Sequence, residues 1–386
     1  MKRFLTGIAL AAALTVSAAA EACENAYAML DGAFEGARMS ACEPEDRNFV
    51  VTIDPENTPI NPSPWYAFRV TPKQTGAINV IIRYSEAQHR YRPKLSEDGK
   101  SWRRLDASHI RERRKGKKVT LRLDLGTEPF FVAAQELLRA DDYERWIEAV
   151  AARVPLTVFP IGESVEGRPL MAIESTPETE RPNKEFVLFM GRQHPPEVTG
   201  ALAMLAFLEM VFSDTPLARD FRARFHVIAV PLLNPDGVVR GHWRHNVNGI
   251  DLNRDWGPFT QPETQAVKAI LDEIAADPNS RLRLMLDFHS TRRNVFYTQA
   301  NAEPTDPPAF TLRWLAAARE RLAGYEFEHA ERPLSKLTTA KNYTYRRFGV
   351  PAITYEIGDR TDRAAIRAST VVFAQEMMET LLGYSP

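Results

Sequence analysis

The hydrophobic pattern of the chain changes near residue 141, and this change limits the folds that are possible. After Asp141, apolar runs of strand length, such as 186–190, are followed by segments long enough for a helix, such as 197–212. Further strands are predicted at 227–233, 284–288 and 352–357. Strands that alternate with helices predict an α/β domain with a mixed, mostly parallel sheet flanked by helices.

The preceding part of the chain has a different pattern. From about residue 48 to 131, apolar and polar residues alternate in short runs, for example at 78–82 and 119–123, with turn signals between them. This pattern predicts an antiparallel β-sandwich. The basic run at 111–118 lies at a predicted hairpin turn and is expected to be a solvated loop, with an anion-binding patch as the alternative.

The first residues predict the compartment. Lys2 and Arg3 precede an apolar run at 4–16 and small residues at 18–22, which is the pattern of a secretory signal peptide. We therefore expect an exported protein, periplasmic or secreted, with a signal peptide at 1–22, a β-sandwich domain at 23–135 and an α/β domain at 136–386. Because export leads to an oxidising environment, Cys23 and Cys42 are expected to form a disulfide, with free thiols as the alternative.

The charge balance limits the kinds of partner. With a formal net charge of −1 and 26% charged residues, the chain has the balance of an ordinary globular protein. We therefore expect neither a nucleic acid nor a membrane as a partner. The sequence leaves the oligomeric state open.

Three potential metal ligands follow two of the predicted strands. His194 and Glu197 stand three residues apart after the strand at 186–190, and His289 follows the strand at 284–288. An open α/β sheet binds its ligands at the carboxyl ends of its strands, so these side chains are expected to meet. Two histidines and one glutamate with an open fourth position form the ligand set of a catalytic zinc.

The other histidines are expected to have structural roles. His242 and His245 lie in a loop rich in Asn and Gly, which favours hydrogen bonding over metal binding. The remaining four are expected to be ordinary core or surface residues: His89, His109, His226 and His329.

Hydrolysis at a zinc site also needs a carboxylate that accepts a proton and a cation that stabilises the developing oxyanion. Glu356 ends a predicted apolar strand and is the candidate base, with a solvated acid at a strand end as the alternative. Arg244 and Arg254 are the candidate cations, unless they form ordinary surface ion pairs. A guanidinium suits a carboxylate, so one of them is expected to bind a substrate C-terminus.

Several motifs occur in the order typical of the zinc carboxypeptidase family, which the chain resembles from about residue 140 to its end. The motifs are Ile161 to Leu170 (IGESVEGRPL), His194-x-x-Glu197, Asn234-Pro235-Asp236-Gly237 and Thr354-Tyr355-Glu356. Within the family, the segments 234–256 and 287–296 are similar to the cytosolic carboxypeptidase subfamily, whose members include tubulin deglutamylases. The motif at 92–96 (RPKLS), within the predicted sandwich, is similar to the same subfamily.

The resemblance implies a role for each candidate residue. His194, Glu197 and His289 bind one zinc ion per chain, and Glu356 is the general base and later the proton donor. Arg244 polarises the scissile carbonyl, and Asn253 and Arg254 hold the terminal carboxylate of a peptide substrate. The region 136–386 is thus expected to be the catalytic domain of a metallocarboxypeptidase.

The resemblance also bears on specificity. Lys341 stands in the stretch where deglutamylating members place an arginine, so the pocket is expected to favour an acidic C-terminal residue, unless Lys341 is a surface residue. No tyrosine aligns with the mobile tyrosine of the digestive carboxypeptidases. The sequence leaves that role open among four tyrosines: Tyr297, Tyr325, Tyr343 and Tyr345.

Three other functions remain open at this point. An aspartoacylase-type deacylase of N-acyl amino acids shares the His-x-x-Glu motif and a later histidine. A carboxypeptidase that trims cell-wall stem peptides suits the predicted compartment. A binding protein with an inactive hydrolase fold would be expected to have lost a ligand or the base, and none is missing here.

Overall fold

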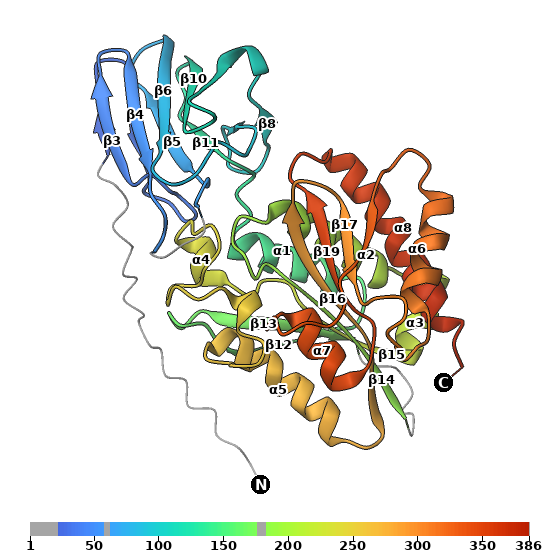
Figure 1. Ribbon diagram of the computed structural model, residues 1–386. Helices are drawn as coiled ribbons and strands as arrows, with labels where there is room; N and C mark the ends of the chain where they lie inside the picture. Colours follow the sequence, from blue (N-terminus) through green and yellow to red (C-terminus); the bar gives the residue numbers. More distant parts are fainter. Residues whose placement is uncertain (1–21, 58–61, 176–182, 386) are drawn as a thin grey trace.

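The computed structural model describes residues 22–57, 62–175 and 183–385 (Figure 1). Apart from residue 22, the predicted signal peptide lies outside these residues. The described chain contains three sheets, two in the N-terminal part and one in the C-terminal part.

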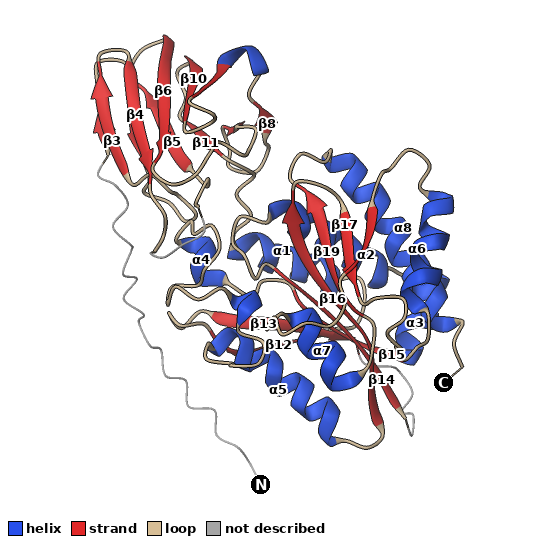
Figure 2. Ribbon diagram, viewed as in Figure 1, coloured by secondary structure: helices blue, strands red, loops and turns tan. Residues whose placement is uncertain are grey.

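The two N-terminal sheets face each other and form a sandwich (Figure 2). One sheet has the order β1-β2-β5-β11-β7-β8 and the other β3-β4-β6-β10-β9. Alternate residues of each strand point into the shared core, for example Ile78, Val80 and Ile82 of β6. The strands are β1 (Cys23–Glu24), β2 (Ala28–Asp31), β3 (Ala41–Glu45), β4 (Asn48–Ile53), β5 (Ala67–Pro72), β6 (Gly76–Tyr84), β7 (Lys94–Ser96), β8 (Arg103–Arg104), β9 (Ile110–Arg113), β10 (Lys118–Leu125) and β11 (Phe130–Ala133), with a 3₁₀ turn, η1, at Ala107–His109.

The sandwich begins at β1, within the predicted range of 23–135, although the alternation in the sequence becomes clear only from about residue 48. It differs from the sequence prediction in its strand pairing. One strand pair, β4 and β6, is parallel rather than antiparallel. The chain leaves β4, crosses to β5 in the opposite sheet and returns to β6, and such a crossover is what brings two strands side by side in the same direction. The basic run at 111–118 forms the hairpin turn between β9 and β10 and is mostly exposed, as predicted.

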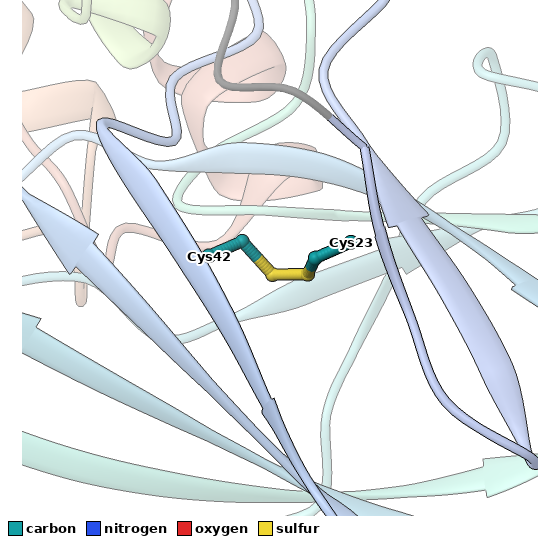
Figure 3. Close-up of a disulfide and its surroundings, with 2 residues drawn as sticks. All are labelled: Cys23 and Cys42. Atoms are coloured by element: carbon teal, nitrogen blue, oxygen red, sulfur yellow. A yellow bond between two sulfur atoms is a disulfide. The ribbon is translucent and has the colours of Figure 1, made fainter.

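A disulfide joins Cys23 and Cys42 (Figure 3). Their Cα atoms are 5.8 Å apart, within the range that disulfides span. Cys23 lies on β1 and Cys42 on β3, so the bond connects edge strands of the two different sheets. The predicted pairing is confirmed, and the disulfide links the two sheets of the sandwich to each other.

The C-terminal part contains an eight-stranded mixed sheet of order β12-β13-β15-β14-β16-β19-β17-β18. Its four central strands, β15, β14, β16 and β19, run parallel, and antiparallel strands flank them. The predicted mixed α/β architecture is therefore confirmed. The strands are β12 (Thr157–Glu163), β13 (Pro169–Ser175), β14 (Lys184–Gly191), β15 (Phe225–Val230), β16 (Ser280–Thr291), β17 (Val295–Thr298), β18 (Glu328–Glu331) and β19 (Ala352–Gly358).

Helices cover both faces of this sheet (Figures 1 and 2). Residues of β14 alternate between the two cores: Val187 and Phe189 pack with α1, α2, α3, α6 and α8, whereas Leu188 and Met190 pack with α5 and α7. The helices are α1 (Ala140–Ala151), α2 (Val198–Val211), α3 (Pro216–Arg224), α4 (Pro235–Val239), α5 (Pro262–Ala276), α6 (Phe310–Arg321), α7 (Ala340–Phe348) and α8 (Arg363–Leu382), with a 3₁₀ turn, η2, at Leu252–Arg254. Among the described residues no single helix is long and apolar enough to cross a membrane; α2 and α3, bent by 91°, meet that criterion only as a pair.

Ion pairs connect the sandwich to the C-terminal part. Lys94, in the motif at 92–96, is buried and lies 2.6 Å from Glu136, which also pairs with Arg363 at 2.7 Å. Arg90 pairs with Asp359 at 2.8 Å. The motif at 92–96 therefore contributes, through Lys94, to the contact between the two parts.

Candidate functional site

Three potential metal ligands meet at the carboxyl ends of β14 and β16. His194 and Glu197 lie in the turn between β14 and α2, and His289 lies near the end of β16. His194 Nδ1 is 2.9 Å from Glu197 Oε1, and His289 Nδ1 is 2.7 Å from Glu197 Oε2. The three donor atoms lie within 4.8 Å of one another. Burial opposes ionisation of Glu197, but the two imidazoles outweigh it and hold the pKa of this carboxyl well below its usual range.

A glycine allows helix α2, which follows Glu197, to lie close to strand β16, which carries His289. Helix α2 begins directly after Glu197, and Gly200 in its first turn lies against β16, where a Cβ atom would overlap the main chain of His289. The backbone N–H of Gly200 donates to Ser290 Oγ at 2.8 Å. The lack of a side chain at position 200 therefore sets the distance between the helix that follows Glu197 and the strand that carries His289.

Each histidine has a carboxylate behind it. His194 Nε2 lies 3.0 Å from Asp251 Oδ1, and His289 Nε2 lies 2.8 Å from Asp287 Oδ2. Such partners fix the orientation of a metal-binding imidazole and leave the other ring nitrogen for the ion, which here is Nδ1 in both cases. The donor set and its outer partners therefore fit a zinc ion.

The sequence interpretation missed these two aspartates. Asp287 stands two residues before His289 on one strand, so both side chains point to the same face, and that spacing was a usable signal. Asp251 is 57 residues from His194 and carried no local signal.

Glu356 lies beside this cluster. Strand β19 pairs in parallel with β16 so that Glu356 stands opposite His289. Glu356 Oε2 is buried and has no hydrogen-bond partner among the described residues. Burial, and then the charge of Glu197, raises the pKa of Glu356 to about 7. A carboxyl group in this position can both accept and release a proton near neutral pH.

Arg244 is held from two sides. Its Nε donates to Asp251 Oδ2 at 2.7 Å, so one aspartate connects Arg244 with His194. Its backbone N–H donates to Glu56 Oε1 at 2.8 Å. Glu56 belongs to the loop that follows β4 of the sandwich, and no pattern in the sequence indicated its role.

The predicted substrate-binding residues lie around the first turn of α7. Asn253 is buried, and its Oδ1 accepts the backbone N–H of Ala340 at 3.0 Å. Arg254 is exposed, and its Nη1 donates to the carbonyl of Asn253 at 2.8 Å. Lys341 is buried rather than a surface residue, and its Nζ donates to the carbonyl of Arg332 at 2.7 Å. Burial lowers the pKa of Lys341 to about 8.

One cavity of about 550 Å³ is lined by all eight residues predicted for the site: His194, Glu197, Arg244, Asn253, Arg254, His289, Lys341 and Glu356. Its lining adds residues that the sequence did not indicate: Arg90 and Tyr91 from the sandwich, together with Trp243 and Arg332. A hollow of about 750 Å³ within the sandwich contains none of the eight.

The remaining candidates lie as follows. His242 and His245 are outside the three-residue cluster, and their Nδ1 atoms lie within hydrogen-bond distance of the carbonyl of His245 and of Glu56 Oε1, respectively. Of the four candidate tyrosines, Tyr297 is the one that lines the cavity. The others pack or bond elsewhere: Tyr325 against Phe373, Tyr343 against Trp256 and Phe259, and Tyr345 to the carbonyl of Pro304.

Comparison with known proteins finds relatives that match about a third of this chain. Cytosolic carboxypeptidase 6 of Mus musculus is 33% identical over 144 residues, which are 35% of this chain and 27% of that protein. Cytosolic carboxypeptidase 1 of Homo sapiens is 35% identical over 141 residues, 33% of this chain and 11% of that protein. The similarity to these relatives thus spans about a quarter of their length or less.

Solved structures resemble the whole described fold. A metallo-carboxypeptidase from Burkholderia cenocepacia has a TM-score of 0.76 at 20% identity, covering 92% of this chain and 98% of that one. A metallo-carboxypeptidase from Pseudomonas aeruginosa, in complex with (2-guanidinoethylmercapto)succinic acid, has a TM-score of 0.75 at 18% identity, covering 91% and 98%. At these identities the likeness shows a shared fold.

The family model described as zinc carboxypeptidase matches residues 143–377, more than half of the chain. The matched region contains the two histidines, the glutamate between them and Glu356. The chain belongs to the zinc carboxypeptidase family.

Proposed function

We propose that the protein is a metallocarboxypeptidase that uses one zinc ion to hydrolyse the C-terminal peptide bond of peptides. The observation that carries this proposal is the position of Glu356. Glu356 lies opposite His289 and lines the same cavity as the metal ligands. One of its carboxylate oxygens, Oε2, has no hydrogen-bond partner among the described residues. Leaving a buried carboxylate oxygen without a hydrogen-bond partner costs stability, and a chemical role explains why such an atom is kept.

The proposed roles follow from what each side chain can donate or accept. A zinc ion held by His194, Glu197 and His289 supplies Lewis-acid chemistry, which favours attack on a carbonyl. Glu356 accepts the proton of the attacking water and later delivers it to the departing amine. Arg244 donates hydrogen bonds to the carbonyl oxygen as negative charge develops on it.

The other end of the cavity suits a free C-terminus. The Arg254 guanidinium and the Asn253 amide are donors that match a carboxylate, so they hold the terminal carboxylate of the substrate. A substrate anchored in this way presents its last peptide bond to Glu356, which restricts cleavage to one bond.

Lys341 supports the finer proposal that acidic terminal residues are preferred. Its ammonium group is buried against the carbonyls of Arg332 and Thr298 and lines the cavity. A carboxylate side chain reaching Lys341 would compensate for the burial of this cation, whereas a basic side chain would be repelled.

The test compares wild type with Glu356→Gln for zinc content and for release of the end residue. The substrates are peptides that end in Glu, Lys, Phe and D-Ala, together with purified stem peptides and N-acyl amino acids. Glu379→Gln, on the exposed side of α8, makes the same chemical change away from the cavity and is the matched control. We expect about one zinc per chain in all three proteins and loss of release in Glu356→Gln alone.

Other outcomes would favour other functions. Cleavage confined to D-Ala and stem peptides would indicate cell-wall metabolism, and hydrolysis of N-acyl amino acids without peptides would indicate a deacylase. Bound zinc without any hydrolysis would favour a binding protein.

We also propose that the protein is exported, as its first residues predict. The disulfide between Cys23 and Cys42 supports this proposal, because such bonds persist in oxidising compartments. Cell fractionation and N-terminal sequencing of the mature protein test it, and a cytoplasmic chain that retains Met1 would contradict it.

A further inference from the structure

The active-site cavity has one end near the start of β19. Thr354 and Glu356 both line the cavity, because residues two apart on a strand point to the same side. Thr354 pairs with Tyr297 of β17, and the next residue, Thr298, offers its carbonyl to Lys341 Nζ. Seen from Glu356, Lys341 therefore lies toward the beginning of β19.

The opposite end lies beyond the end of β19. The parallel pairing places Ser290 beside Ile357 and Thr291 beside Gly358, and Ser290 and Thr291 both line the cavity. Asp359 follows directly, and its Oδ2 accepts a hydrogen bond from Arg90 Nε at 2.8 Å. Arg90 and Lys341 therefore occupy opposite ends of the cavity, with Glu356 between them.

The sandwich fixes Arg90 in place. Arg90 belongs to the loop between β6 and β7, and its guanidinium lies 5.3 Å from the ring centre of Tyr91 and 5.7 Å from that of Trp243. Trp243 Nε1 donates to Tyr91 Oη at 3.2 Å, which ties the two aromatic side chains together. The Arg90 side chain is 18% exposed. It is thus held by the protein while it contributes to the cavity wall.

The guanidinium retains donors for a ligand. Among the described residues, the bond from Nε to Asp359 is the one hydrogen bond recorded for the Arg90 side chain, so the Nη1 and Nη2 groups have donors to offer. Because Asp359 already balances the charge of Arg90, a neutral carbonyl oxygen is a better match than a second carboxylate.

We propose that Arg90 is a substrate-binding residue that the N-terminal sandwich supplies to the catalytic site. It donates to main-chain carbonyl groups of the peptide one or two residues before the bond that is cut. The inference rests on the proposed carboxypeptidase function: with the terminal residue at the end formed by Lys341, the preceding residues must extend toward the other end. An extended peptide advances roughly 3.3 Å per residue, as β19 does between Glu356 and its end.

A chain-length series tests this role. Propionyl-X lacks a carbonyl before the scissile one, whereas acetyl-Ala-X and acetyl-Ala-Ala-X have one and two, where X is the terminal residue that wild type releases fastest. We expect Arg90→Ala to lower kcat/KM for acetyl-Ala-Ala-X by about tenfold or more, as for loss of hydrogen bonds from a charged group. Release from propionyl-X should stay within about threefold of wild type, because it makes none of these bonds.

Two further variants separate binding from structure. Arg104→Ala removes another contact between the sandwich and the catalytic part, the bond from Nη2 to the carbonyl of Arg360, at a residue outside the cavity lining. It should leave the ratio of the two kcat/KM values unchanged. Arg90→Lys keeps a cation with fewer donors and should give an intermediate ratio, and it carries the test if Arg90→Ala does not fold.

The outcomes distinguish this inference from the function on which it rests. If wild type cleaves none of the series, the carboxypeptidase proposal fails and the inference falls with it. If wild type cleaves all three but the Arg90 variants change every substrate equally, or change none, Arg90 does not bind the substrate chain.

Discussion

Glu56 Oε1 accepts a hydrogen bond from the backbone N–H of Arg244 at 2.8 Å, although 188 residues separate the two in sequence. The Glu56 side chain is fully buried and also lies 3.3 Å from His245 Nδ1. A residue of the sandwich therefore fixes the main chain of the arginine that is proposed to polarise the substrate carbonyl. We predict that Glu56 acts through Arg244, as a positioning residue.

The variant Glu56→Gln should lower kcat about tenfold with little change in KM. The weaker amide acceptor lets Arg244 shift, and small displacements of a group that stabilises the transition state are costly. Steady-state kinetics on the best peptide measures both constants. Glu45→Gln, at an exposed position on β3, is the control, and an unchanged kcat in Glu56→Gln would remove the positioning role.

Glu56 should also make folding stability depend on acid pH. Burial alone would raise the pKa of Glu56, but hydrogen bonds from His245 and from the backbone N–H of Arg244 outweigh it and lower the pKa to about 2. Because the folded pKa is below the usual 4.5, the ionised form stabilises the fold above about pH 4.5, and this stabilisation is lost as the pH falls toward 2. Urea unfolding should show the advantage of wild type over Glu56→Gln shrinking across this range. A constant difference would contradict the assignment.

Preference for an acidic terminal residue should disappear in alkaline solution. Burial lowers the pKa of Lys341 to about 8, so its cation is present below that pH and is lost above it. The ratio of kcat/KM for peptides ending in Glu to those ending in Ala should fall as the pH rises through about 8, since kcat/KM reports the free enzyme.

The Lys341 variants provide the comparison for that profile. Lys341→Met should give a low ratio at every pH, and Lys341→Asp should favour peptides that end in Lys. The exposed Lys336→Met, in the loop before α7, should behave as wild type. Unchanged selectivity in both Lys341 variants would show that another group reads the terminal side chain.

Removing the carboxylate behind one zinc ligand should weaken the metal site. Asp287 Oδ2 lies 2.8 Å from His289 Nε2 and accepts a second bond from Gln193 at 2.7 Å. Asp287→Asn should lower zinc affinity about 10- to 100-fold, the usual effect of losing such a partner. Competition with a chromogenic chelator measures the affinity. Excess zinc should restore activity, and Asp214→Asn, at an exposed ion pair, is the control.

The catalytic half of the molecule was the more predictable from sequence. The strands β14, β16 and β19 contain buried apolar runs. His194 follows β14, and His289 and Glu356 lie near the ends of β16 and β19, so the parallel order of these strands brought all three residues to one edge of the sheet. The cavity gathers these and the other predicted residues.

The contributions of the sandwich were not predictable in the same way. Arg90 and Glu56 lie in loops, where no periodicity reports on packing, and their roles arise from docking against segments more than 150 residues away. The parallel pairing of β4 with β6 depends on a crossover between sheets, which alternation within a single strand does not encode.

The close approach of α2 to β16 has a consequence for sequence change in this protein. Gly200 has no side chain that could bind the metal and does not line the cavity, yet the spacing of the zinc ligands depends on the space that its missing side chain leaves beside His289. A single methyl group added at this position would therefore weaken metal binding, although all three ligand residues would be unchanged. The metal site therefore requires a residue without a side chain at position 200 as well as its three ligand side chains.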